Sequence, residues 1–275
     1  MSQQVLTSGD ELLTFDNDVY RTAPRRLSWF SRTFPTCSFY RQFFWNVCRS
    51  SGQARRGRYG DREWSVTSYE VLQSLESVGV EFEVSGVEHI RGLQSPCVFV
   101  GNHMSMCETI VLPSIIQPVR PVTFVVKQSL LEYPLFRHII RSRDPIAVSR
   151  ENPREDLKEM MNGGDERLRQ GISIVVFPQT TRSDTFEPSQ FNSIGVKLAL
   201  RANVPVIPIA LKTDAWGNGK RFKDLGPIDP AKKVQIAFGE PLSIEQRGAR
   251  QHQEIVSYIE AKLSQWSHSD CETGR

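Results

Sequence analysis

The chain has 275 residues with 34 basic and 31 acidic side chains, which gives a formal net charge of +3, and 39% of its residues are hydrophobic. This composition excludes a disordered chain and fits one large domain with a small extension. No run of residues reaches the roughly 18 apolar positions of a membrane-spanning helix, and the acidic N-terminus is not typical of a secretory signal. The five cysteines lack Cys-x-x-Cys spacing, which indicates reduced thiols rather than a metal site or a disulfide framework.

Residues 20–62 combine arginines with aromatic rings. They hold ten arginines, no lysine and one acid, Asp61. Phe39, Phe43 and Val47 recur every four residues, which predicts a helix with an apolar stripe. The rings could pack on the rest of the chain, lie in a membrane interface, or bind nucleic acid. The arginine excess favours a surface that carries phosphates, so we expect this segment to dock on an anionic membrane.

Short runs rich in valine and isoleucine follow a helical pattern at residues 69–78. Strands are expected at residues 80–84, 97–101, 122–127, 145–150, 172–178, 204–211 and 234–240, and helices at 133–141, 154–169 and 193–202. This alternation predicts an α/β fold with a mixed, largely parallel sheet flanked by helices. The stretch SIEQ at Ser243–Gln246 predicts a capping box that opens a final helix ending near residue 264. We expect residues 1–65 to form the helical membrane-docking segment and residues 66–275 to form the α/β domain.

A histidine and a glutamate follow the expected strand CVFVG. His103 comes two residues after that strand, where ligands of open α/β sheets bind, and Glu108 is the acid that follows it in the sequence. An imidazole is a better proton acceptor when a carboxylate holds its other nitrogen. Five positions on one helix would put the two side chains on different faces. The pairing therefore requires His103 in a turn and Glu108 inside the helix that follows.

Further polar side chains follow neighbouring strands. The stretch VVFPQTTRSD supplies an amide, hydroxyls and a guanidinium, and Lys127 and Arg150 close two more strands. Arginine forms forked hydrogen bonds with phosphate or carboxylate. Since these groups share one sheet edge, they predict a crevice with a base and a cationic wall.

Four blocks in this order resemble the glycerolipid acyltransferase family, which includes the 1-acylglycerol-3-phosphate acyltransferases. They are NHMSMCE, KQSLLEYPLFRHIIRSRDPIAVSR, FPQTTRS and VPVIPIAL, and they lie within residues 98–211. The family pattern has aspartate where this chain has Glu108, Glu-Gly where it has Gln179 and Thr180, and glycine where it has Arg137.

The resemblance implies a membrane-associated O-acyltransferase. It implies that His103 is the general base and Glu108 its orienting partner, with a lysophospholipid-like acceptor and acyl-CoA or acyl carrier protein as donor. It places the enzyme at the cytoplasmic face of a membrane, peripheral or monotopic. It implies no cofactor, no metal and no nucleic-acid partner. The expected substrate-binding residues are Asn102, Lys127, Arg150, Gln179, Thr180, Thr181, Arg182 and Ser183.

Other functions also fit the sequence. The acceptor could be a different lysolipid or another hydroxyl-bearing lipid, because Gln179 and Thr180 change the block that contacts the acceptor head in the family. A catalytically silent lipid-binding protein would have the same fold. An RNA-binding protein could use the arginine-rich segment, although no recognisable nucleic-acid motif accompanies it.

Overall fold

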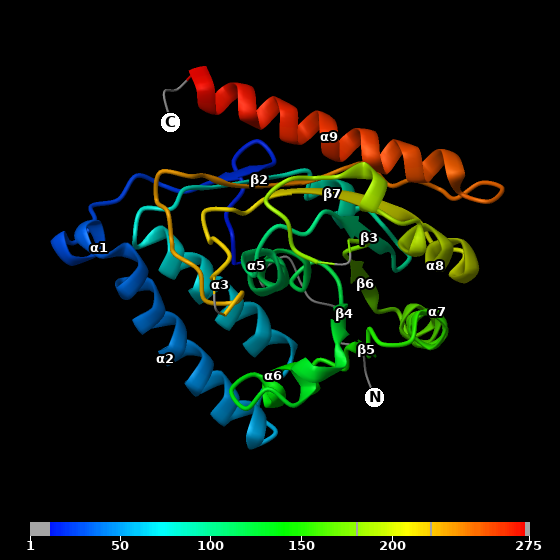
Figure 1. Ribbon diagram of the computed structural model, residues 1–275, viewed down its shortest axis with the longest axis horizontal. Helices are drawn as coiled ribbons and strands as arrows, with labels where there is room; N and C mark the ends of the chain where they lie inside the picture. The colour runs from blue at the N-terminus through cyan, green and yellow to red at the C-terminus, as the bar shows by residue number, and fades with distance from the viewer. Residues whose placement is uncertain (1–11, 180, 221, 273–275) are drawn as a thin grey trace.

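The computed structural model describes residues 12–179, 181–220 and 222–272, and Thr180 lies outside them. Strands in the described part of the chain form one sheet in the order β1-β2-β8-β7-β3-β6-β4-β5 (Figure 1). They are β1 (Val19–Arg21), β2 (Phe82–Ser85), β3 (Val98–Gly101), β4 (Val122–Lys127), β5 (Ile146–Val148), β6 (Ser173–Val176), β7 (Val206–Lys212) and β8 (Val234–Phe238). One half of the sheet is mixed. There β1 pairs with β2 and β7 pairs with β8 in antiparallel fashion, whereas β2 and β8 are parallel. Strands β7, β3, β6, β4 and β5 are parallel, which confirms the mixed, largely parallel sheet.

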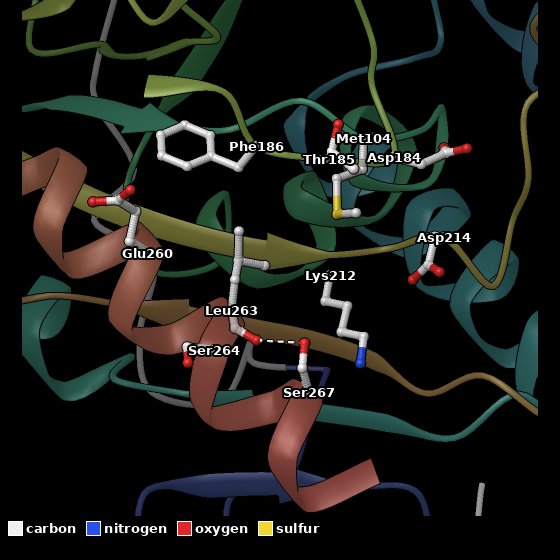
Figure 2. Close-up of a pocket in the computed structure, with 10 residues that line it drawn as sticks. All are labelled: Met104, Asp184, Thr185, Phe186, Lys212, Asp214, Glu260, Leu263, Ser264 and Ser267. Carbon is white, nitrogen blue, oxygen red and sulfur yellow. Dashed lines mark hydrogen bonds between the residues drawn. The ribbon is translucent and has the colours of Figure 1, made fainter. Parts of the chain in front are cut away.

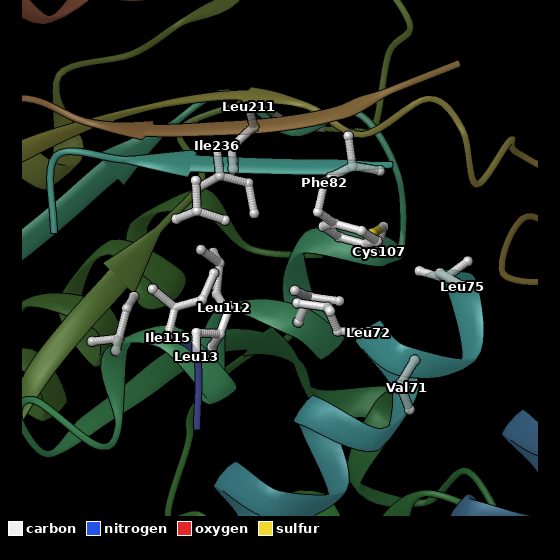
Figure 3. Close-up of a cluster of buried hydrophobic side chains, with 14 of the residues drawn as sticks. Leu13, Val71, Leu72, Leu75, Phe82, Cys107, Leu112, Ile115, Leu211 and Ile236 are labelled. Atoms are coloured by element: carbon white, nitrogen blue, oxygen red, sulfur yellow. The ribbon is translucent and has the colours of Figure 1, made fainter. Parts of the chain in front are cut away.

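Helices cover both faces of this sheet. They are α1 (Trp29–Thr33), α2 (Pro35–Arg55), α3 (Asp61–Glu76), α4 (Glu88–Arg91), α5 (Cys107–Ile116), α6 (Arg137–Arg141), α7 (Pro153–Arg169), α8 (Ile194–Ala202) and α9 (Ala249–Glu272). On one face, α5 lies between the sheet and α3, and apolar side chains from all three layers meet in one core (Figure 3). On the other face, α7, α8 and α9 pack over a second core. The central strands are buried on both faces, which explains their continuous apolar runs.

The final helix begins later than the sequence predicts. The expected capping box at Ser243–Gln246 is wrong, because α9 starts at Ala249. Gln246 and Gly248 have φ angles of 52° and 74°, which interrupt a helix. A Cβ at Gly248 would lie 2.4 Å from Val196, so this left-handed position requires glycine.

Two other helices have different bounds from those expected. The helix expected at residues 133–141 begins only at Arg137, after a 3-10 turn at Gln128–Leu131. Pro134 accounts for the delay, because the residue before a proline avoids the helical region. Helix α3 begins at Asp61, and the Glu63 carboxylate accepts the Gly60 N–H at 2.9 Å at its N-terminus. The expected domain boundary between residues 65 and 66 therefore falls inside a continuous helix.

The predicted apolar stripe of α2 faces the protein. Phe39 and Phe43 are fully buried, and their ring centroids lie 4.7 Å and 5.2 Å from that of Trp216. The stripe is therefore part of the domain core and is not available to a membrane. The opposite side of α1 and α2 exposes a separate set of rings, of which Trp29 is 75% and Trp45 73% accessible. Within the described residues, no helix is both long enough and apolar enough to cross a bilayer.

Candidate active site

The end of β3 determines where His103 lies. Asn102 is fully buried, and its side-chain amide donates to the Leu211 carbonyl at 2.7 Å and accepts from the Leu211 N–H at 2.9 Å. The side chain was expected to bind substrate; instead it ties β3 to β7 with both ends of its amide. Its role in this structure is to hold the backbone immediately before His103.

His103 and Glu108 form the expected pair. Nδ1 of His103 lies 2.8 Å from Oε1 of Glu108, with His103 in the turn and Glu108 as the second residue of α5. The same carboxylate accepts backbone N–H groups of Met104 and Ser105 at 2.7 Å and 3.0 Å. An acid at a helix N-terminus is also favoured by the helix dipole. Glu108 thus folds the turn back on the helix and aims the imidazole at the same time.

The Glu108 carboxylate is completely buried and fully hydrogen-bonded. Thr213, which follows β7, donates to Oε2 at 2.5 Å, and the Ser105 hydroxyl donates at 3.1 Å. Burial by itself raises the pKa of Glu108, but hydrogen bonding to His103, the His103 charge and the Thr213 bond outweigh it and hold the pKa below its usual value. The carboxylate is therefore ionised at neutral pH.

The second ring nitrogen of His103, Nε2, does not contact Glu108. In the neutral imidazole, a bond to a carboxylate places the ring proton on Nδ1, so Nε2 carries the lone pair. Among the described residues, Nε2 has no hydrogen-bond partner, and the side chain is 15% exposed. The imidazole stacks on Phe177 with a centroid distance of 4.5 Å and an interplanar angle of 8°. Phe177 thus holds the ring plane while Glu108 holds one edge.

The FPQTTRS loop, residues 177–183, contacts the His103 turn directly. The Gln179 side-chain oxygen accepts the His103 N–H at 2.6 Å, and the Ser183 N–H donates to the His103 carbonyl at 3.0 Å. Gln179 is buried, so its amide oxygen supports the turn rather than facing solvent. The Ser183 hydroxyl accepts the Thr185 N–H at 3.3 Å. The first and third sequence blocks therefore form a single unit.

A second loop, residues 217–227, contacts the FPQTTRS loop and is called the 217–227 loop below. Arg182 forms an ion pair with Asp224 at 2.6 Å, and the Lys223 ammonium donates to the Thr181 hydroxyl at 3.0 Å. Arg182 is thus placed at the site as the sequence predicts, but with an acidic partner that the sequence did not indicate.

Lys127 and Arg150 lie farther out on the same sheet edge. Lys127 is the last residue of β4 and Arg150 follows β5, and these strands are two and three strands away from β3. At the usual spacing of parallel strands, these strands are about 10 Å and about 14 Å from β3. Both side chains are exposed, and Arg150 has a φ of 64° with its N–H donated to Asp156. The structure therefore brings Gln179, Thr181, Arg182 and Ser183 to His103, and leaves Lys127 and Arg150 at the periphery.

Several residues of the site are not indicated by the sequence motifs. Thr213 follows β7 at the same sheet edge, so the strand-end rule that identified His103 could have found it. Phe177 adjoins the proline of the third block, but nothing in its spacing indicates ring stacking. Lys223 and Asp224 lie in a polar loop with no pattern that points to the site.

A cavity lies on the α9 side of the His103 turn (Figure 2). It has a volume of about 520 Å³ and lies between β7, residues 184–186 and α9. Its wall mixes apolar side chains such as Met104 and Leu263 with polar ones such as Lys212 and Asp214. None of the residues expected from the sequence lines this space, although Met104 directly follows His103.

Comparisons with known proteins agree with this geometry. The family described as Acyltransferase matches residues 81–212. A 1-acyl-sn-glycerol-3-phosphate acyltransferase of Pseudomonas aeruginosa is 31% identical over 187 residues, which cover 68% of this chain and 69% of the relative. The human 1-acyl-sn-glycerol-3-phosphate acyltransferase beta is 25% identical, over 66% of this chain and 61% of its own. The crystal structure of the Thermotoga maritima enzyme PlsC, titled a 1-acyl-sn-glycerophosphate acyltransferase, superposes with a TM-score of 0.61 at 19% identity and covers 84% of this chain and 94% of its own, which shows a shared fold. The chain is therefore an acyltransferase enzyme and belongs to the glycerolipid acyltransferase family.

Proposed function

We propose that this enzyme transfers a fatty acyl group from a thioester donor to the free hydroxyl of a lysophospholipid, with 1-acyl-glycerol 3-phosphate as the first candidate acceptor. The relatives' names support the acceptor class, and acyl-CoA or acyl carrier protein would be the donor. The observation that carries the proposal is the 2.8 Å contact of His103 Nδ1 with a buried carboxylate, because it leaves Nε2 ready to accept a proton.

In the proposed reaction, His103 acts as general base. Nε2 takes the proton of the acceptor hydroxyl while that oxygen bonds to the thioester carbonyl carbon. The carbon–sulfur bond then breaks, and the departing thiolate takes the proton back from the imidazolium. The products are an ester and a free thiol, and no cofactor is required. The buried Glu108 carboxylate stabilises the imidazolium while it exists.

Direct transfer is favoured over an acyl-enzyme intermediate. Cys107 is fully buried, and burial raises the pKa of its thiol well above the usual value, so it stays protonated and unreactive. The Ser105 hydroxyl is 1% exposed and hydrogen-bonds to Glu108 and Thr213. Neither of these two side chains is therefore accessible to a thioester.

The acceptor's anionic head would bind at the FPQTTRS loop. Arg182 is half-buried there, and four of its five N–H donors have no hydrogen-bond partner among the described residues. A guanidinium with free donors matches a phosphate group. The loop is hydrogen-bonded to both the N–H and the carbonyl of His103, so a head group held by Arg182 would lie close to the base.

We also propose that the enzyme binds the cytoplasmic face of a membrane as a peripheral or monotopic protein. The support comes from the exposed rings of α1 and α2 together with exposed arginines beside them. Aromatic rings and cations suit the interface between lipid chains and anionic head groups.

Acyl transfer to a panel of acceptors tests the proposed function. Purified enzyme, acyl-CoA and detergent-dispersed acceptors would be incubated, with diacyl products measured by mass spectrometry. We expect the highest kcat/KM with lysophosphatidate, a lower value with lysophosphatidylcholine, and the lowest with monoacylglycerol. A phosphate monoester offers Arg182 more free oxygens and more charge than a phosphodiester does, and monoacylglycerol has no phosphate. No product from any acceptor, or equal rates for monoacylglycerol and lysophosphatidate, would contradict the proposal.

A further inference from the structure

Two adjacent residues of the 217–227 loop contact two adjacent residues of the FPQTTRS loop. The Lys223 ammonium donates to the Thr181 hydroxyl at 3.0 Å, and the Asp224 carboxylate pairs with Arg182 at 2.6 Å. One segment therefore brings a cation and an anion to the place where the acceptor head group is proposed to bind. Neither residue belongs to any of the four sequence blocks.

The contacts of the 217–227 loop fix these two residues relative to His103. Asn218 donates to the Met104 carbonyl at 2.9 Å and to the Asp184 carboxylate at 3.1 Å. At the other end, the Gly226 carbonyl accepts from the Tyr40 hydroxyl at 2.7 Å, and the Gly217 N–H donates to the Pro227 carbonyl at 2.9 Å. A Cβ at Gly226 would lie 1.7 Å from the Gly217 carbonyl oxygen, so the base of the loop closes tightly.

The two charged residues have different surroundings. The Asp224 carboxylate accepts a hydrogen bond from one N–H of Arg182, whose side chain is 16% exposed, and this contact restrains the orientation of the guanidinium. The Lys223 ammonium contacts a neutral hydroxyl, and in the part of the chain that the structure describes it has no carboxylate within ion-pair distance. Lys223 thus adds one uncompensated positive charge beside Arg182.

We propose that Lys223 is a second cationic ligand for the acceptor's anionic head group, and that Asp224 is a positioning residue that orients Arg182 toward the same group. This inference rests on the proposed function, in which the FPQTTRS loop receives that head group. Thr181 keeps the ammonium in place when the site is empty. A phosphate carries enough oxygens to accept from the Lys223 ammonium and the Arg182 guanidinium together.

Phosphates also occur in the donor, because coenzyme A carries a diphosphate and a ribose phosphate. The two sources are separated by kinetics, since a residue that binds the acceptor changes the acceptor KM and leaves the donor KM unchanged. A neutral acceptor also distinguishes the acceptor phosphate from the donor phosphates, because monoacylglycerol has no phosphate for Lys223 to bind.

The experiment compares Lys223→Ala, Lys223→Arg and Asp224→Asn with two reference variants. Arg182→Ala reports on the head-group site itself. Lys220→Ala removes the same charge from an exposed position of the same loop. For each protein, KM and kcat would be measured for lysophosphatidate, acyl-CoA and monoacylglycerol, and folding would be checked by thermal unfolding.

We expect Lys223→Ala to raise the lysophosphatidate KM about tenfold, as loss of one charge-assisted hydrogen bond does. The acyl-CoA KM, the kcat and the monoacylglycerol kinetics should stay near wild-type values, and Lys223→Arg should restore most of the affinity. Asp224→Asn should raise the lysophosphatidate KM by a smaller factor, through a less ordered Arg182. Lys220→Ala should behave like the wild type.

Three outcomes would overturn the inference. If Arg182→Ala raises the lysophosphatidate KM while Lys223→Ala matches Lys220→Ala, the head-group site is correct and Lys223 is not part of it. If Lys223→Ala raises the acyl-CoA KM instead, the ammonium binds the donor. If the wild type transfers no acyl group to lysophosphatidate, the proposed function fails and the inference fails with it.

Discussion

At the scale of single residues, the carboxylate of Glu108 has two roles that substitutions can separate. It closes the turn through the Met104 and Ser105 N–H groups, and it holds the His103 ring by its Nδ1. Glu108→Asp keeps the charge but shortens the side chain, so we expect part of the kcat to remain. Glu108→Gln removes the charge that would stabilise the imidazolium in the proposed reaction, and we expect kcat to fall roughly 100-fold.

Steady-state kinetics on folded variants would decide this. Thr213→Val is a suitable comparison, because it removes one hydrogen bond to the same carboxylate without touching its charge. A Gln variant as fast as the Asp variant would show that the charge plays no part in turnover.

The lowered pKa of Glu108 also predicts how stability depends on pH. Because the folded pKa lies below the unfolded value, the unfolded chain binds more protons as the pH falls through this range. The contribution of Glu108 to the free energy of unfolding is therefore fully present above the unfolded pKa of about 4.5 and is lost as the pH falls through the folded pKa. Chemical denaturation of wild type and Glu108→Gln across pH 3 to 7 would measure this. Equal slopes below pH 4.5 would show that the Glu108 charge does not stabilise the fold.

The sequence indicates the dyad but not all of its support. His103 and Glu108 are five positions apart, so their pairing required His103 in a turn before the helix, and the family resemblance implied that pairing. Thr213 reaches the same carboxylate from 105 positions farther along the chain, and only the pairing of β3 with β7 brings it there. The resemblance assigned Asn102 to substrate because it belongs to the first block, whereas its burial and its two bonds to Leu211 show that it joins two strands.

At the scale of elements, helix α2 has two aromatic faces with different roles. Phe39 and Phe43 contact Trp216 in the core, whereas Phe44 and Trp45 are exposed. Periodicity predicts that a helix has an apolar face, but it does not say whether protein or lipid covers that face. Trp216, which lies far away in sequence, decides the question for Phe39 and Phe43.

The exposed and the buried rings of α2 should respond differently to substitution. Trp45→Ser with Phe44→Ser should leave the stability unchanged and reduce binding to anionic lipid vesicles at high salt, where ring burial is the remaining attraction. Phe39→Ala should instead cost about 3–5 kcal/mol of stability, as truncation of a buried ring does. Vesicle co-sedimentation and thermal unfolding of both proteins would be compared. Unchanged vesicle binding of the double variant would reject the outer face of α2 as a docking surface.

The bounds of β4 at Val122–Lys127 match the prediction, and most other strands differ from theirs by one or two residues. Continuous valine and isoleucine runs account for this agreement, because central parallel strands are buried on both faces. The start of α9 could not be predicted in the same way. It depends on the contact of Gly248 with Val196 on α8, which the local sequence SIEQ does not reveal.

At the scale of the whole molecule, charge is distributed unevenly. The net charge is only +3, yet the segment at residues 20–62 has ten arginines and one acid. Some of these arginines have internal partners, such as Arg25 with Glu76. Among the described residues, Arg26, Arg32 and Arg41 are exposed and have no ion-pair partner, so they are available to an anionic surface.

Binding to anionic vesicles should therefore weaken as salt is raised. Each arginine near such a surface contributes about 1 kcal/mol, and only within a Debye length of about 10 Å at 0.1 M salt. Changing Arg26, Arg32 and Arg41 together to glutamine should remove most of the salt-sensitive binding and leave the part due to the rings. Co-sedimentation with neutral and anionic vesicles measures both parts. Equal binding of the wild type to the two kinds of vesicle would contradict the role of the arginines.

The sheet places His103, the turn orients it, and the proposed membrane-docking surface would deliver its lipid. The most direct test is acyl transfer to lysophosphatidate by the His103→Ala variant, with His268→Ala on the exposed face of α9 as the control. We predict that His103→Ala keeps the wild-type unfolding temperature and loses acyl transfer by about 100-fold or more, while the control stays fully active. A folded His103→Ala protein that transfers acyl groups at the wild-type rate would contradict the account.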